Sequence, residues 1–149
     1  MKARIILALV LAGAPLAATA QPTMERAAEF FGKPKIVGVH TLTRHDPSHG
    51  ANDINPGVYL ITDKGWTVGT YYNSHFRQTF YAGYTTPEWY RFRLTASFNT
   101  GYNALPTATV VPTFRLYTFD NGMTLRFAGG PKLEEKGQSI QHLLIDWEL

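Results

Sequence analysis

The sequence predicts an all-β protein, an eight-stranded antiparallel up-and-down β-barrel that follows a short N-terminal amphipathic helix. Eight segments of eight to twelve residues recur after Lys35, separated by clusters of Gly, Pro, Asn and Asp. Several of these segments alternate apolar and polar residues, which is the period of a β-strand. Eight such strands in about 115 residues would close into a barrel, because closure removes the exposed edges of an open sheet.

Residues 1–20 have the features of a secretory signal peptide. Lys2 and Arg4 precede an apolar run, and Ala18-Thr19-Ala20 forms a small-x-small cleavage site before Gln21. The apolar run is too short for a membrane-spanning helix, which needs roughly 20 residues. We therefore expect an exported chain with a single domain over residues 21–149.

The charge of the expected mature chain does not suggest a nucleic-acid partner. The full chain has 14 Lys and Arg against 11 Asp and Glu, and removing residues 1–20 takes away two basic residues, so the net charge falls from +3 to 12 − 11 = +1. No run of Lys and Arg would make a basic face. The chain has no cysteine, so its stability cannot rest on disulfides. We expect no nucleic-acid partner and no cofactor.

The first predicted element is an amphipathic helix over about residues 23–33. Thr23 fits an N-cap, Phe30 and Phe31 belong to the apolar face, and Gly32 would end the helix. The barrel then occupies about residues 35–149.

The barrel strands are predicted from eight segments and the turns between them. Asp63-Lys64-Gly65 and Asp120-Asn121-Gly122 are hairpin signals, because Asn and Gly accept the positive φ of tight turns. The predicted strands are 35–44, 56–63, 66–73, 76–86, 90–99, 108–119, 123–130 and 139–149.

Alternation gives each strand an apolar and a polar face but does not say which face points inward. In segment 90–99, for example, Phe92 and Phe98 share one face, whereas Arg93 and Asn99 share the other. A water-soluble barrel would turn the apolar face inward, and an outer-membrane barrel would turn it toward lipid. Segment lengths near 9–11 residues and the many aromatic residues suit the membrane version.

Ser74 is the clearest candidate nucleophile, and it needs a base within hydrogen-bond reach. Five histidines could supply that base: His40, His45, His49, His75 and His142. The segment His40 to His49 could also be interpreted as a metal site, but its spacing on a strand that runs into a polar loop does not match the regular ligand spacing of zinc sites. We therefore expect no metal.

The motifs, taken in order, resemble the lipid A palmitoyltransferase family of Gram-negative outer membranes. The resemblance is carried by "HTLTR" from His40, by "DKGWTVGTYYNSHFRQTFYAGY" from Asp63, and by "LTASFNTGY", "LPTATVVPTF" and "MTLRFAGGP" further on. It implies an eight-stranded outer-membrane barrel with an N-terminal amphipathic helix. It also implies transfer of a palmitoyl chain from a phospholipid to lipid A.

Carried over by position, the resemblance makes His40 the catalytic histidine and Ser74 the catalytic serine. Asn73 stands where the family has an aspartate, and an amide can orient a partner but cannot take a proton. We therefore expect an acyltransferase-like barrel whose activity is reduced or lost.

Four arginines are expected in the lumen, where they would bind an anionic headgroup or a fatty-acid carboxylate. They are Arg91, Arg93, Arg115 and Arg126. The alternative function is a non-catalytic barrel of the periplasm or outer membrane that binds a lipid or another small ligand. A structural or inhibitory envelope protein is a third alternative. The expected partners are a phospholipid or lipid A, and the expected state is a monomer.

Overall fold

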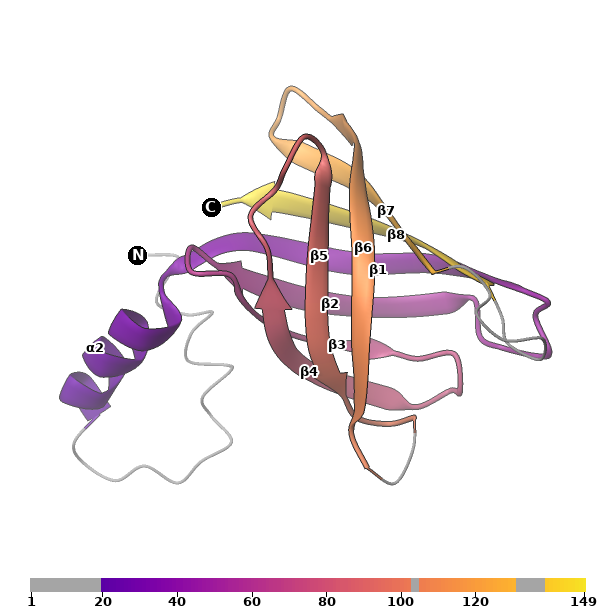
Figure 1. The fold of residues 1–149 in the computed structure, drawn as a ribbon, viewed down its shortest axis with the longest axis horizontal. Helices are drawn as coiled ribbons and strands as arrows, with labels where there is room; N and C mark the ends of the chain where they lie inside the picture. The colour runs from indigo at the N-terminus through magenta and orange to yellow at the C-terminus, as the bar shows by residue number, and fades with distance from the viewer. Residues whose placement is uncertain (1–19, 103–104, 131–138) are drawn as a thin grey trace.

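The structure is a computed structural model that describes residues 20–102, 105–130 and 139–149. Eight antiparallel strands form a closed barrel in which each strand pairs with its neighbours in sequence and β8 pairs with β1 (Figure 1). The predicted eight-stranded up-and-down barrel is therefore confirmed. The predicted signal peptide lies outside the described residues, except for Ala20.

The strands agree with the predicted segments to within a few residues. They are β1 (Pro34–Asp46), β2 (Ile54–Thr62), β3 (Trp66–Tyr72), β4 (Gln78–Thr85), β5 (Phe92–Asn99), β6 (Thr107–Thr118), β7 (Met123–Gly130) and β8 (Ser139–Glu148). Both predicted glycine turns form, with Gly65 at φ 86° and Gly122 at φ 80°. In each turn the glycine N–H donates to the carbonyl three residues earlier, at 2.9 Å.

Helix α2 (Ala20–Phe31) lies outside the barrel at the end where β1 begins (Figure 1). The helix begins at Ala20, three residues before the predicted start at Thr23. The predicted end holds, since the N–H of Gly32 donates to the carbonyl of Ala28 at 2.9 Å. Phe30 and Phe31 then pack against Trp66 with ring centroids 5.7 and 5.5 Å apart, which docks the helix on the β2–β3 turn.

The two ends of the barrel carry different segments. The helix end holds α2 and the turns at 63–65 and 120–122, and the loop end holds residues 47–53 and the β3–β4 turn at 73–77.

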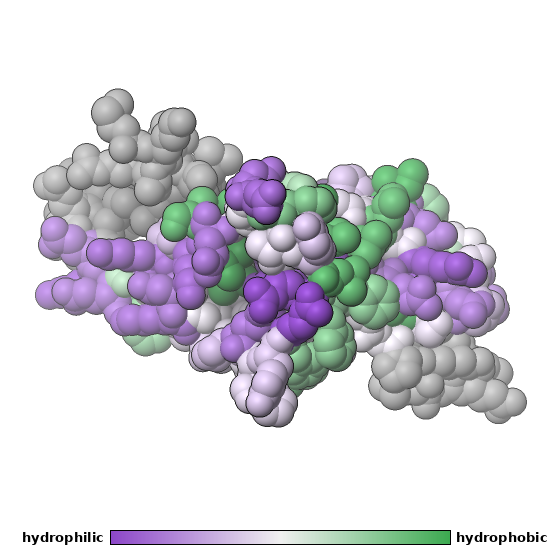
Figure 2. All heavy atoms as spheres, turned by 90° about the horizontal axis from the view of Figure 1, so that it is seen from above, coloured by the Kyte–Doolittle hydropathy of each residue, from purple (hydrophilic) through white to green (hydrophobic). Residues whose placement is uncertain are grey.

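The apolar faces of the strands point outward, which settles the question that alternation leaves open. Val58, Phe80, Phe98 and Val110 are between 55% and 67% exposed, whereas the polar neighbours of Phe80 and Phe98, which are Thr79, Ser97 and Asn99, are buried. Figure 2 shows apolar side chains gathered over the middle part of one face, with polar side chains concentrated toward both ends. The barrel therefore has an apolar exterior and a polar interior.

The interior contains a small apolar core surrounded by polar groups. Tyr59, Ile61, Ala128 and Leu144 form the buried hydrophobic cluster. Buried polar residues are more numerous: His45, Asn55, Thr67, Asn73, Thr79, Thr85, Arg93, Ser97, Asn99, Thr113, Thr124, Arg126 and Asp146. A lumen of this composition positions hydrogen-bonding and charged groups where a ligand could meet them.

Candidate functional site

The lumen holds two cavities, and an ion-pair network lies between them. The His–Tyr cavity, of about 560 Å³, is lined by His40, His142, Tyr59, Tyr71 and Tyr81 among others, and it extends to Ser74 at the loop end. The arginine cavity, of about 660 Å³, opens at the helix end. Arg93 lines both cavities, so the network to which it belongs separates them.

A chain of four hydrogen-bonded side chains crosses the His–Tyr cavity. The hydroxyl of Tyr81 lies 2.9 Å from Nε2 of His40, and Nδ1 of His40 lies 2.9 Å from Nε2 of His142. Nδ1 of His142 lies 2.5 Å from the hydroxyl of Thr43. Both ring nitrogens of His40 are therefore occupied by protein partners.

Glycines make room for the aromatic rings around His40. The rings of Tyr59 and Tyr71 lie 5.2 and 5.0 Å from the His40 ring, centroid to centroid. A Cβ at Gly69 would fall 2.5 Å from atoms of the Tyr81 ring, so only glycine lets that ring lie across β3. The sequence thus builds an aromatic wall on β2, β3 and β4 by pairing each large ring with a small neighbour.

Ser74 lines the His–Tyr cavity with His40, but the two residues do not form a hydrogen-bonded pair. Gly57 pairs with both His40 and Tyr71, so His40 is level with Tyr71 in the sheet. Ser74 lies three residues beyond Tyr71, about 10 Å farther along an extended chain. The catalytic pairing of Ser74 with His40 stays a prediction that would require movement of both groups.

Asn73 has a structural role in the β3–β4 turn, and none of its hydrogen bonds links it to His40 or to the side chain of Ser74, so its place in a catalytic site stays a prediction. Its side chain is fully buried and does not line either cavity. Oδ1 accepts hydrogen bonds from the N–H groups of His75 and Arg77 at 2.8 and 3.0 Å. Nδ2 donates to the hydroxyl of Thr79 at 2.9 Å and to the carbonyl of Gly101 at 3.2 Å. An asparagine, unlike an aspartate, can make all four of these bonds.

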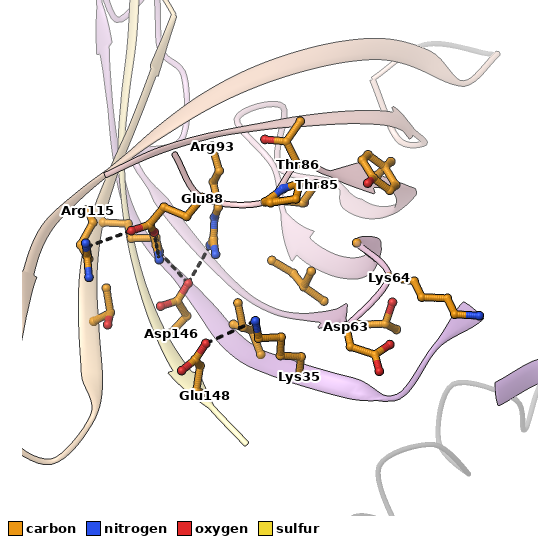
Figure 3. A pocket seen from close by; sticks show the side chains of 18 of the residues that line it. Lys35, Asp63, Lys64, Thr85, Thr86, Glu88, Arg93, Arg115, Asp146 and Glu148 are labelled. Carbon is orange, nitrogen blue, oxygen red and sulfur yellow. Dashed lines mark hydrogen bonds and ion pairs between the residues drawn. The ribbon is translucent and has the colours of Figure 1, made fainter. Parts of the chain in front are cut away.

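Three of the four predicted lumenal arginines form an ion-pair network with two acids (Figure 3), in which Arg93, Arg126 and Asp146 are the buried members. Asp146 accepts from Nη2 of Arg93 at 2.6 Å and from Nε of Arg126 at 2.8 Å. Nη2 of Arg126 also lies 2.6 Å from a carboxylate oxygen of Glu88. Nε of Arg115 lies 3.0 Å from the other oxygen of Glu88, an ion pair without the alignment of a hydrogen bond.

This network neutralises most of the positive charge that the arginines bring into the lumen. Arg93 and Arg126 are 4% and 5% exposed, and Asp146 is 3% exposed. Buried charges require such partners, because transfer from water costs several kcal/mol per ion in order of magnitude. A fatty-acid carboxylate would therefore have to compete with Asp146 and Glu88 for the guanidinium groups.

The predicted lumenal position of Arg91 is wrong. Its side chain is exposed, lines neither cavity and donates to the carbonyl of Leu116 at 3.0 Å. The cause is the backbone before β5, where Tyr90 has a φ of 57° and Trp89 forms an isolated bridge with Phe92. This tight turn interrupts the strand, so the alternation that places Arg93 inward does not extend back to Arg91.

His45 and Asp53 form a second pair of titratable groups at the loop end of the His–Tyr cavity. Nδ1 of His45 lies 2.8 Å from Oδ1 of Asp53, and the His45 side chain is 3% exposed. The described residues contain no group of three or more His, Asp or Glu side chains that could hold a metal ion. An imidazole whose Nδ1 contacts a carboxylate is held in one orientation at the edge of the cavity.

Sequence reasoning missed several residues of the site. His142 and Asp146 belonged to the polar face of the last predicted strand, but no signal tied them to His40 or to the arginines. Glu88 carried no local signal of a role. Pairing of β8 with β1 brings His142 beside Thr43, and this contact exists only because the barrel closes.

Comparisons with models of protein families and with curated proteins give no match to this chain. Helix α2 has 12 residues and is too short and too polar to cross a membrane. The function is therefore argued from the geometry of the barrel.

Proposed function

We propose that this protein is a β-barrel of the outer membrane that binds a membrane lipid, a phospholipid or lipid A, inside its lumen. The observation that carries the proposal is the apolar exterior around a polar interior that contains the His–Tyr cavity. An exported barrel with the opposite arrangement would suit the periplasm.

The exterior supports contact with lipid. The strands have 7 to 13 residues, and a transmembrane strand needs about 9–11. Exposed aromatic residues at the helix end include Trp66, Trp89 and Tyr90. Amphipathic rings of this kind are enriched at membrane–water interfaces, where one part of the ring is apolar and another is wet.

The His–Tyr cavity supports the binding of a lipid chain. Its volume of about 560 Å³ lies within the usual range of ligand pockets, about 300–1,000 Å³. Pairing of β6 with β7 stops at Thr113 and Ala128, next to Pro112, which has no N–H to donate. Beyond this point the cavity is lined by Val110, which faces outward, so it extends to the outer surface of the barrel.

Membrane insertion can be tested by fractionation and by one substitution. The mature protein should require detergent for extraction from the envelope, and Val58→Lys should destabilise the barrel by about 2–4 kcal/mol in lipid vesicles, because Val58 faces outward near the middle of β2. A water-exposed site would tolerate the same change to within about 0.5 kcal/mol. Extraction with buffer alone would overturn the membrane proposal.

Lipid binding can be tested separately on the purified barrel. Organic extraction followed by mass spectrometry should recover phospholipid or lipid A from the wild type and less from a variant with a filled cavity. Equal lipid content in both would contradict the lumenal site.

The second candidate function is transfer of an acyl chain from a phospholipid to lipid A. It is favoured by one observation, that Ser74 and His40 line the same cavity. Labelled phospholipid incubated with lipid A should yield a labelled acyl-lipid A, and Ser74→Ala and His40→Ala should each lower the yield. Undiminished transfer in both variants would remove these roles.

A further inference from the structure

We propose that Ser74, His45 and Asp53 form a serine acyl-transfer site at the loop end of the His–Tyr cavity, with His45 as the general base in place of His40. This inference deepens the second candidate function and rests on it. His45 is assigned as the base because of its hydrogen bond to Asp53, whereas the order of motifs along the chain points to His40.

His45 has the environment of a catalytic histidine that is oriented by an acid. The carboxylate of Asp53 is 2.8 Å from Nδ1, which fixes the ring and favours the tautomer with a proton on Nδ1. Nε2 then presents a lone pair, and it has no hydrogen-bond partner among the described residues. His45 also lines the cavity, so this nitrogen is available to a group inside the lumen.

The backbone brings Ser74 to the level of this pair. The N–H of Thr43 donates to the carbonyl of Asp53, and the N–H of Asn52 donates to the carbonyl of Ser74, both at 2.9 Å. The backbone segments that extend β1, β2 and β3 therefore run side by side beyond the paired residues of the sheet. The segment of Asn52 and Asp53 lies between the segment of His45 and that of Ser74. Two inter-strand spacings amount to about 10 Å between the Cα atoms. An imidazole, a serine hydroxyl and one hydrogen bond together span such a distance.

His40 is less suited to the same task. Its two ring nitrogens are already bonded to His142 and Tyr81, and it lies level with Tyr71, deeper in the barrel than Ser74. The hydroxyl of Ser74, in contrast, has no hydrogen bond with any residue in the described part of the chain. Among the described residues, therefore, neither the hydroxyl of Ser74 nor Nε2 of His45 has a hydrogen-bond partner, and both residues line the same cavity.

The chemistry follows from these positions and needs only an ester and an acceptor. Oγ of Ser74 attacks the ester carbonyl carbon of a lipid while its proton passes to Nε2 of His45. The tetrahedral intermediate collapses, the C–O bond to the leaving alcohol breaks, and that alcohol takes the proton from His45. An acceptor hydroxyl or water then gives its proton to His45 and attacks the carbonyl carbon of the acyl-serine; the bond from this carbon to Oγ breaks, and His45 returns the proton to Oγ of Ser74, with the acyl group transferred to the acceptor.

The N–H groups of His75, Phe76 and Arg77 in the β3–β4 turn already have partners, so they are not available to stabilise an oxyanion. The N–H groups of His75 and Arg77 are bonded to Oδ1 of Asn73, and that of Phe76 is bonded to the carbonyl of Asn73 at 3.1 Å. The side chain of His75 lines the cavity beside Ser74 and is the nearest donor in sequence.

The test is the rate at which a fluorophosphonate probe labels Ser74 in the full mature chain held in detergent micelles. This probe reacts with an activated serine hydroxyl and needs no knowledge of the natural lipid. We expect labelling of the wild type at Ser74, and a loss of about 10²–10⁴-fold in rate for His45→Gln, the range of general-base catalysis. Asp53→Asn should lower the rate at least tenfold and alter its pH dependence, whereas His40→Gln should lower it less than tenfold.

His49→Asn is the matched control, because His49 is exposed on the same loop and lines neither cavity. This variant should be labelled at the wild-type rate. The migration of each unheated variant on a gel checks separately that its barrel has folded. Labelling of folded His45→Gln at the wild-type rate would overturn the proposal, as would absence of label on wild-type Ser74. If the wild type is not labelled by the probe but still co-purifies with lipid, the proposed lipid binding is unaffected. If Ser74 is labelled but the protein transfers no acyl chain, only the transferase function is contradicted.

Discussion

Replacing Asp146 by asparagine should destabilise the barrel far more than the same kind of change at Glu148, two residues along the same strand. Asp146 is 3% exposed and neutralises Arg93 and Arg126 through contacts of 2.6 and 2.8 Å. Asp146→Asn removes the charge and leaves Glu88 as the one carboxylate of the network. Breaking a buried pair by removing one partner costs about 3–5 kcal/mol, because the remaining charge is buried without compensation.

Glu148→Gln is the internal control for this prediction. Glu148 pairs with Lys35 at 3.7 Å, but the side chains are 75% and 54% exposed. Exposed pairs of this kind contribute about 0–1 kcal/mol. The two substitutions therefore make the same chemical change in β8 at sites that differ mainly in burial.

The assay is urea unfolding of each variant in detergent micelles, followed by tryptophan fluorescence. We expect the free energy of unfolding to fall by about 3–5 kcal/mol for Asp146→Asn and by less than about 1 kcal/mol for Glu148→Gln. The double variant Arg93→Met, Asp146→Asn should lose less than the sum of its single changes, because the two groups contact each other. A loss for Asp146→Asn within about 1 kcal/mol of the Glu148→Gln value would refute the assigned network.

Three further predictions concern the turn, the aromatic wall and the cavity. Asn73→Asp should lower the free energy of unfolding by about 1–3 kcal/mol and should not raise acyl transfer, because the new carboxylate cannot donate the two bonds that Nδ2 makes; a rise in measured transfer would contradict the structural role of Asn73. Gly69→Ala should cost about 1–3 kcal/mol in urea titrations by displacing the Tyr81 ring, whereas Gly130→Ala, where a Cβ meets no atom within 4 Å, should be neutral; equal losses would contradict this packing. Gly130→Trp should reduce the lipid recovered by extraction, since Gly130 lines the His–Tyr cavity, and unchanged lipid content would argue against binding there.

The fold could be predicted from local information. Strand periodicity placed all eight strands, and the two Asp-x-Gly turns were found because the required positive φ depends on the turn residues themselves. The places where prediction failed, before β5 and after β3, are governed by single backbone conformations. Tyr90 and Phe76 adopt positive φ angles of 57° and 58° that their residue types do not announce.

By itself, therefore, the sequence determined that the chain forms eight strands, in which apolar and polar residues alternate so that each strand has one apolar and one polar face. Only the tertiary structure decided that the apolar faces point outward, since alternation has the same period in either orientation. It also decided the partners within the site. Asp146 on β8 meets Arg93 on β5, 53 residues away, because the closed barrel turns both side chains into one lumen, and His40 meets His142 across 102 residues because closure pairs β1 with β8. Contacts over such separations depend on how the whole chain closes, and no short stretch of sequence encodes them.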